Sequence, residues 1–131
     1  MRRLREGQVS LAVNVNLRKE ISISRPMEEG IGKMATAYIV DAVRTAGGKR
    51  NGKLAGWHPV DMAAATLDAI VTRTGIDGGR VEDVIMGCVS QAGQQAMQVG
   101  RNAVLAAKTL PQHVPAVTID RQCGSSQQAI Q

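Results

Sequence analysis

The stretch VPAVTIDRQCGSSQQAIQ, residues 114–131, decides the fold. Residues 114–119 form an apolar, β-branched run with its proline near the start, where a strand tolerates proline best. A polar segment at 120–122 leads to a turn at Cys123 and Gly124, and residues 125–131 have the composition of a starting helix. An apolar strand, a tight turn and a helix in direct succession are typical of α/β proteins.

Two further strand–helix pairs precede this stretch. Apolar runs at 37–43 (AYIVDAV) and 84–89 (VIMGCV) predict strands, and a glycine- and lysine-rich loop is expected at 45–56. A helix is predicted from Pro59 to about Gly75, because proline suits the first helical position and glycine a helix end. A second helix is predicted at 96–108. The order predicts an α/β fold with a mostly parallel sheet covered by helices.

The first 33 residues differ in character from the rest. They carry seven basic and four acidic side chains, a net charge of +3 out of +5 for the whole chain. No apolar run approaches the roughly 20 residues needed to span a bilayer, and no secretory signal is apparent. We interpret residues 1–33 as a disordered leader or as an extension upstream of a start at Met34, and residues 34–131 as an incomplete domain that ends inside its last helix. The expected location is cytoplasmic.

Composition excludes several classes of function. The charge excess lies largely in the front segment, and aromatic residues make up only 2%, so a nucleic-acid-binding face is not indicated. Cys88 and Cys123 are too few for a disulfide framework, and His58 and His113 are not spaced with them as zinc ligands. We therefore predict no metal, no cofactor, no nucleic-acid partner and no membrane partner.

Cys123 is the candidate catalytic residue. A helix N-terminus presents unpaired N–H groups and a partial positive charge, which favour a thiolate over a thiol, and the thiolate is the nucleophilic form. The backbone N–H of Cys123 is a candidate oxyanion donor. The pattern alone also allows, and by itself slightly favours, an inert buried thiol beside a helix that Ser125 or Ser126 caps. Cys88 is expected to be structural, and His58 to cap a helix or lie on the surface.

Residues 114–131 also resemble the active-site block of the thiolase family. Three further blocks, at 37–54, 81–93 and 98–126, resemble that family in the same order and spacing, so the resemblance covers about residues 35–131. It implies a partial N-terminal half of a thiolase-like fold, cut in the helix that follows the nucleophile, with Cys123 as the acylated cysteine. Ser126 stands where many thiolases have glycine, which leaves the acyl preference open.

The resemblance implies an acyl-CoA C-acyltransferase of fatty acid or lipid metabolism. Cys123 would accept an acyl group from a coenzyme A thioester, followed by Claisen condensation with acetyl-CoA or, in reverse, thiolysis of a 3-ketoacyl-CoA. The family also uses a histidine and a second cysteine that match no residue here, so the 131 residues alone are expected to be inactive. Thiolases form homodimers or homotetramers, which is the expectation for a full-length form.

Two alternatives remain at this point. The first is a condensing enzyme of the ketoacyl-synthase type, which also places a cysteine at a helix start. The second is a non-catalytic, thiolase-like protein that binds acyl-CoA or lipid without turnover. The sequence Asp-Arg-Gln-Cys-Gly-Ser-Ser and the Arg44-Thr45 loop favour the thiolase over the synthase.

Overall fold

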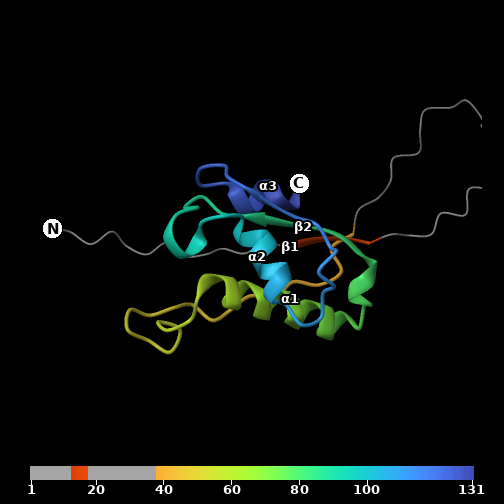
Figure 1. The fold of residues 1–131 in the computed structure, drawn as a ribbon, viewed down its shortest axis with the longest axis horizontal. Coiled ribbons are helices and arrows are strands. Elements are labelled where there is room, and N and C mark those ends of the chain that lie inside the picture. Colours follow the sequence, from red (N-terminus) through yellow and green to blue (C-terminus); the bar gives the residue numbers. More distant parts are fainter. Residues whose placement is uncertain (1–12, 18–37) are drawn as a thin grey trace, which may run out of the picture.

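The computed structural model describes residues 13–17 and 38–131. Its sheet has the strand order β1-β2-β3, and Figure 1 shows the helices around it. The elements in chain order are β1 (Val13–Leu17), α1 (Pro59–Thr74), the short 3-10 helix η1 (Gly78–Arg80), β2 (Val81–Gly87), a second 3-10 helix η2 (Gly93–Gln95), α2 (Val99–Ala106), β3 (Ala116–Ile119) and α3 (Ser125–Ile130).

Strands β2 and β3 form the parallel pair that the sequence predicts. Val84 lies opposite Ala116 and Gly87 opposite Ile119, and α2 forms the helical part of the connection between the two strands. Parallel neighbours require such a crossover, because a tight hairpin joins only antiparallel strands. The predicted α/β class is therefore confirmed.

The other neighbour of β2 comes from the segment interpreted as a leader. Strand β1 pairs antiparallel with β2, with Val13 opposite Met86 and Val15 opposite Val84. An edge strand presents unpaired N–H and C=O groups that any extended segment can satisfy, and the sequence VNVNL alternates in the manner of a strand. For these five residues the structure differs from the expected disorder, while the rest of residues 1–33 lies outside the described residues.

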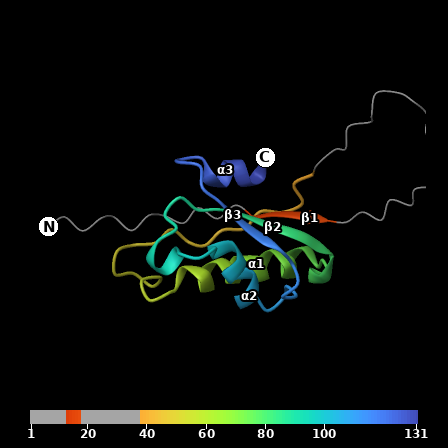
Figure 2. The same cartoon turned by 45° about the horizontal axis from the view of Figure 1, so that its top comes forward.

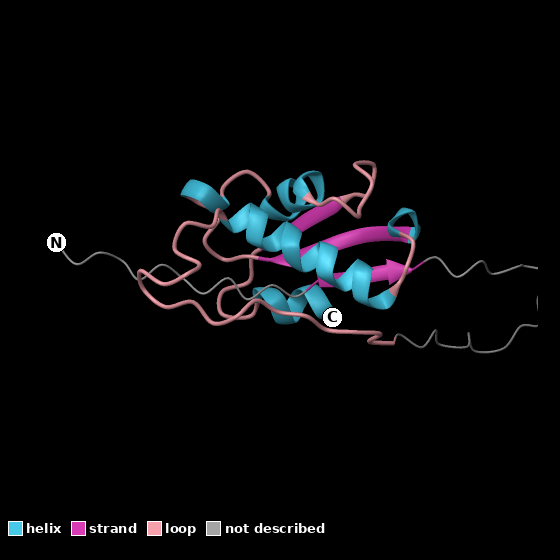
Figure 3. Ribbon diagram, turned by 90° about the horizontal axis from the view of Figure 1, so that it is seen from below, coloured by secondary structure: helices cyan, strands magenta, loops and turns pink. Residues whose placement is uncertain are grey.

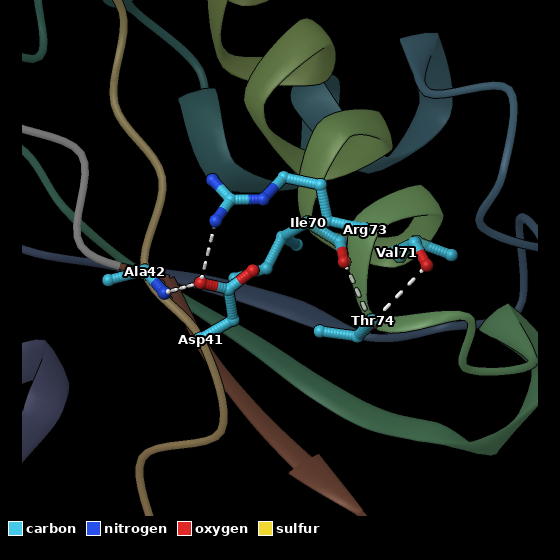
Figure 4. Close-up of polar contacts among 6 residues, drawn as sticks. All are labelled: Asp41, Ala42, Ile70, Val71, Arg73 and Thr74. Carbon is cyan, nitrogen blue, oxygen red and sulfur yellow. Dashed lines mark hydrogen bonds and ion pairs between the residues drawn. The ribbon is translucent and has the colours of Figure 1, made fainter.

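The strand predicted at 37–43 is wrong for residues 38–43, which have no regular secondary structure. This segment pairs with no strand of the described sheet, in which β1 takes the place beside β2, and Tyr38, Ile39 and Val40 are 82%, 84% and 69% exposed. Asp41 holds the segment against α1 instead. Its Oδ1 accepts hydrogen bonds from Arg73 Nη2 at 3.1 Å and from the Ala42 N–H at 2.7 Å (Figure 4).

The sheet lies between two helical layers. Figure 2 shows α3 on one face and α1 with α2 on the other, and Figure 3, seen from below, shows the long helix α1 in front of the strands. Alternate strand residues point to opposite faces, so Val84 and Met86 face α1 and α2, whereas Gly87 faces α3. The largest fully buried side chains are those of Leu67, Met86, Val84, Val99, Val104 and Val114.

The ends of α1 follow the sequence signals closely. His58 is the N-cap, and its Nδ1 accepts a hydrogen bond from the Val60 N–H at 3.3 Å, while Gly75 ends the helix in the left-handed conformation at φ 65°. The predicted cap role of His58 is thus confirmed. The predicted second helix is shorter than expected, because Met97 and Gln98 adopt φ values of 59° and 64° and α2 starts only after them.

Asp68 connects α1 to the loop that follows α2. Its Oδ1 accepts hydrogen bonds from the Lys108 and Thr109 N–H groups, both at 2.9 Å, and from the Thr109 hydroxyl at 2.7 Å. This fixes the chain direction before β3 begins. Within the described part of the chain, no helix is long and apolar enough to cross a membrane, and no group of three potential metal ligands occurs.

Truncation of a core side chain should lower the free energy of unfolding far more than truncation of a surface side chain. Leu67 of α1 is fully buried, so Leu67→Ala leaves a cavity and is expected to lower the free energy of unfolding by roughly 2–5 kcal/mol. The matched control is Leu105→Ala in α2, whose side chain is 45% exposed and whose loss should cost about 0.5 kcal/mol or less. Equilibrium unfolding in urea measures both, and equal losses would contradict this description of the core.

Candidate active site

Cys123 lies at the edge of the sheet where the parallel strands end. Since β2 and β3 run in the same direction, their carboxyl ends meet at one edge, which is where open α/β sheets bind ligands. The Cys88 N–H donates to the Ile119 carbonyl at 3.0 Å and joins the two strand ends. Four residues after Ile119, Cys123 stands in the turn between β3 and α3, with its side chain exposed.

The backbone of Cys123 is in an unfavourable conformation for a residue with a side chain. Its φ angle is 60°, in the left-handed region that favours glycine. A non-glycine residue there costs about 1–3 kcal/mol, so neighbouring interactions must hold it in place, and such positions concentrate at functional sites. The turn is closed by a hydrogen bond of 2.8 Å from the Gly124 N–H to the Arg121 carbonyl.

Ser125 makes two hydrogen bonds across the same turn. Its Oγ accepts from the Arg121 N–H at 2.9 Å and donates to the Arg121 carbonyl at 2.8 Å. Its side chain therefore bonds back to residue 121 across Cys123. At the surface, Arg121 Nη1 donates to Gln128 Oε1 at 2.7 Å, one turn into α3. The alternative of a buried thiol at position 123 is wrong, because Cys123 is exposed.

Gly87, the last residue of β2, is where α3 contacts the sheet. A Cβ atom at this position would lie 2.3 Å from the carbonyl carbon of Ser125 and 2.3 Å from the Ser126 nitrogen. Both atoms belong to the backbone, so only glycine allows α3 to approach this closely. The sequence analysis did not identify Gly87, although a glycine inside an apolar strand is the usual signal of close backbone approach.

The second cysteine has a different environment from Cys123. Cys88 is buried, and its Sγ donates to Gln95 Oε1 at 3.3 Å. Burial raises the pKa of the Cys88 thiol above its ordinary value, and this outweighs the opposite effect of a hydrogen bond with the Ser90 backbone. These features fit the structural role expected for Cys88. His113 is exposed in the loop before β3, at the opposite end of that strand from Cys123.

The part of the chain that contains Cys123 is similar to known proteins. A family model described as the N-terminal domain of thiolase matches residues 37–131. A steroid 3-ketoacyl-CoA thiolase of Mycobacterium tuberculosis is 57% identical over 97 residues, which are 74% of this chain and 24% of that protein. A β-ketoadipyl-CoA thiolase of Acinetobacter baylyi is 45% identical over 98 residues, again 74% and 24%. A 3-ketoacyl-CoA thiolase of Yersinia pestis is 38% identical over 99 residues, 74% and 25%. The chain spans about a quarter of the length of these relatives.

A side chain at position 87 should displace α3. Gly87→Ala is expected to lower the free energy of unfolding by roughly 1–3 kcal/mol, because the new methyl group meets backbone atoms of α3, which must shift to make room for it. Gly47→Ala is the control, since a Cβ there meets nothing within 4 Å. Thermal or urea unfolding compares the two variants. A Gly87→Ala protein as stable as the Gly47→Ala protein would contradict the close contact.

The two cysteines should differ sharply in reactivity. With iodoacetamide near neutral pH, Cys123 is expected to react at least tenfold faster than Cys88, as a rough estimate, because the thiolate is the reactive form and Cys88 is buried with a raised pKa. Peptide-resolved mass spectrometry follows each site separately. In urea the two rates should approach each other, and faster labelling of Cys88 in the folded protein would overturn the assignment of environments.

Proposed function

Because the chain belongs to the thiolase family, we propose that it supplies the nucleophile of an acyl-CoA C-acyltransferase, with Cys123 as the acceptor of the acyl group. One observation carries the proposal: Cys123 is an exposed thiol in a left-handed turn at the carboxyl ends of two parallel strands. A substrate reaches such a sulfur without any displacement of the core. The matched family region contains the whole turn.

The reaction begins at the thioester carbonyl of an acyl-CoA. The Cys123 thiolate attacks this carbon, a C–S bond forms, and the carbonyl electrons move to oxygen. The backbone N–H of Cys123 is a candidate donor to that oxyanion. Collapse of the intermediate expels the CoA thiolate and leaves an acyl-enzyme. Claisen condensation with acetyl-CoA, or thiolysis of a 3-ketoacyl-CoA in the other direction, completes the proposed cycle.

The substrate class that we propose is the 3-ketoacyl thioester of coenzyme A. The names of the relatives support it, since they act on a steroid 3-ketoacyl-CoA, β-ketoadipyl-CoA and 3-ketoacyl-CoA. These names also favour the thiolase over the ketoacyl-synthase alternative. Ser126, next to the start of α3, leaves the acyl preference open. We also propose that the full-length enzyme is cytoplasmic, belongs to lipid metabolism and forms a homodimer or homotetramer.

The second half of the cycle needs an acid–base group, and among the described residues neither histidine nor Cys88 is placed to supply it to Cys123. His58 caps α1 through its Nδ1, and His113 lies beyond the amino end of β3. Cys88 points its sulfur at Gln95 inside the fold. We therefore expect no turnover by the 131 residues alone, and the catalytic tests below use a polypeptide of the relatives' length that contains them, here called the full-length polypeptide.

Acylation is the direct test of the nucleophile. Incubation of the full-length polypeptide with acetyl-CoA is expected to give a single acetyl adduct, which peptide-resolved mass spectrometry should locate on Cys123. Cys123→Ala should abolish the adduct, because Cys88, the other thiol of the described residues, is buried.

The matched control for this test is Cys88→Ala. It removes the other cysteine of the chain, which is buried, and should leave the adduct on Cys123 in place. An adduct that persists in Cys123→Ala, or the absence of any adduct in the unchanged protein, would refute the assignment of Cys123. Turnover lost with acylation retained would favour the non-catalytic, acyl-CoA-binding alternative.

A further inference from the structure

We propose that Ser125 is a positioning residue for Cys123, which it holds by bonding both polar backbone groups of Arg121. The inference rests on the proposed function of Cys123 and adds a residue through which the reactivity of that site is set. Ser125 itself is 5% exposed and lies under the turn, so it acts on substrate only through the cysteine.

The two hydrogen bonds of the Ser125 hydroxyl define a closed ring of backbone. The hydroxyl accepts from the Arg121 N–H at 2.9 Å and donates to the Arg121 carbonyl at 2.8 Å. Its proton and one of its lone pairs are therefore both used on the same residue. These bonds fix the distance in space between residues 121 and 125, and Cys123 lies midway between them along the chain. A serine in this arrangement limits where the Cys123 Cα can lie.

The backbone of the same serine is fixed from below. Gly87 brings β2 so close that an added Cβ would lie 2.5 Å from the Ser125 carbonyl oxygen and 2.3 Å from its carbonyl carbon. Ser125 is therefore held by the sheet on one side and bonds the turn on the other. Through these contacts the end of β2 helps to fix the position of Cys123, the residue with a φ angle of 60°.

Loss of the hydroxyl would affect the turn specifically. The Arg121 carbonyl would keep the Gly124 N–H as a donor at 2.8 Å, whereas the Arg121 N–H would lose the acceptor that the structure gives it. The turn would then relax toward a less strained geometry at residue 123. A displacement of about 1 Å at a reacting atom lowers rates by up to roughly a hundredfold, so the effect should be visible in acylation.

The experiment compares Ser125→Ala, Ser125→Thr and Gln128→Ala in the full-length polypeptide. The acetyl-CoA acylation rate of Cys123 reports on positioning, and iodoacetamide labelling of Cys88 reports on folding, because Cys88 is buried in the intact structure. Gln128→Ala is the matched control, since it removes the exposed side-chain bond from Arg121 to α3 and leaves the Ser125 hydroxyl in place.

The expected result is an acylation rate at least tenfold lower in Ser125→Ala, as a rough estimate, with Cys88 still protected. Ser125→Thr, which keeps a hydroxyl, and Gln128→Ala should acylate within about threefold of the unchanged protein. Normal acylation in Ser125→Ala overturns the proposal. If Ser125→Ala exposes Cys88, the threonine variant decides, and slow acylation there with Cys88 protected also overturns it.

Failure of the proposed function can be distinguished from failure of the positioning role of Ser125. If the unchanged protein is not acylated at all, the nucleophile assignment falls. The positioning role is then judged from the pH profile of Cys123 alkylation by iodoacetamide, which reports on the surroundings of the sulfur without a thioester. A profile that is identical in the unchanged protein and in Ser125→Ala overturns the inference on Ser125, and a shifted profile supports it.

Discussion

The close approach of the α3 backbone to Gly87 is the constraint on which the site depends. It brings Ser125 onto the end of β2, and the parallel pairing of β2 with β3 puts the turn that carries Cys123 at the same edge of the sheet. Any side chain at position 87 would push α3 away from the sheet and change the distance between the strand ends and the turn. The exposed thiol is thus located by backbone contacts, which vary little in position compared with long side chains.

The two cysteines show how one sheet edge provides two environments. Cys88 directly follows β2, stays under η2 and the loop around it, and bonds Gln95, so burial disfavours its ionised form. Cys123 follows β3 after a polar turn that carries it out of the core. The difference arises from how far each cysteine lies from its strand. Cys88 directly continues a buried strand and remains between the layers, whereas Cys123 lies in a turn four residues beyond β3 and is exposed.

The sequence predicted the parts of the fold that local chemistry controls. Helix α1 follows from Pro59, Asp61 and Gly75, and the turn at Cys123 follows from an apolar strand that gives way to small polar residues. The error at residues 38–43 has another origin, because a β-prone run becomes a strand only when it pairs with a neighbour, and here β1 lies beside β2 while Asp41 bonds Arg73 of α1. The Ser125 bonds and the Gly87 contact were equally beyond prediction, since they join residues that no periodicity relates.

Backbone strain gathers at the carboxyl edge of the sheet. Asn51 is left-handed in a surface turn, where asparagine is common, but Met97, Gln98 and Cys123 are not typical of that conformation. Gln98 is held by its side chain, which accepts from the Thr118 N–H at 3.2 Å, near the end of β3 and five residues before Cys123. Glycine would relieve the strain at each of these positions at no cost in space. Natural sequences that keep an unfavourable residue in such a place do so mainly where the side chain is needed, and at position 123 that side chain is a thiol open to solvent.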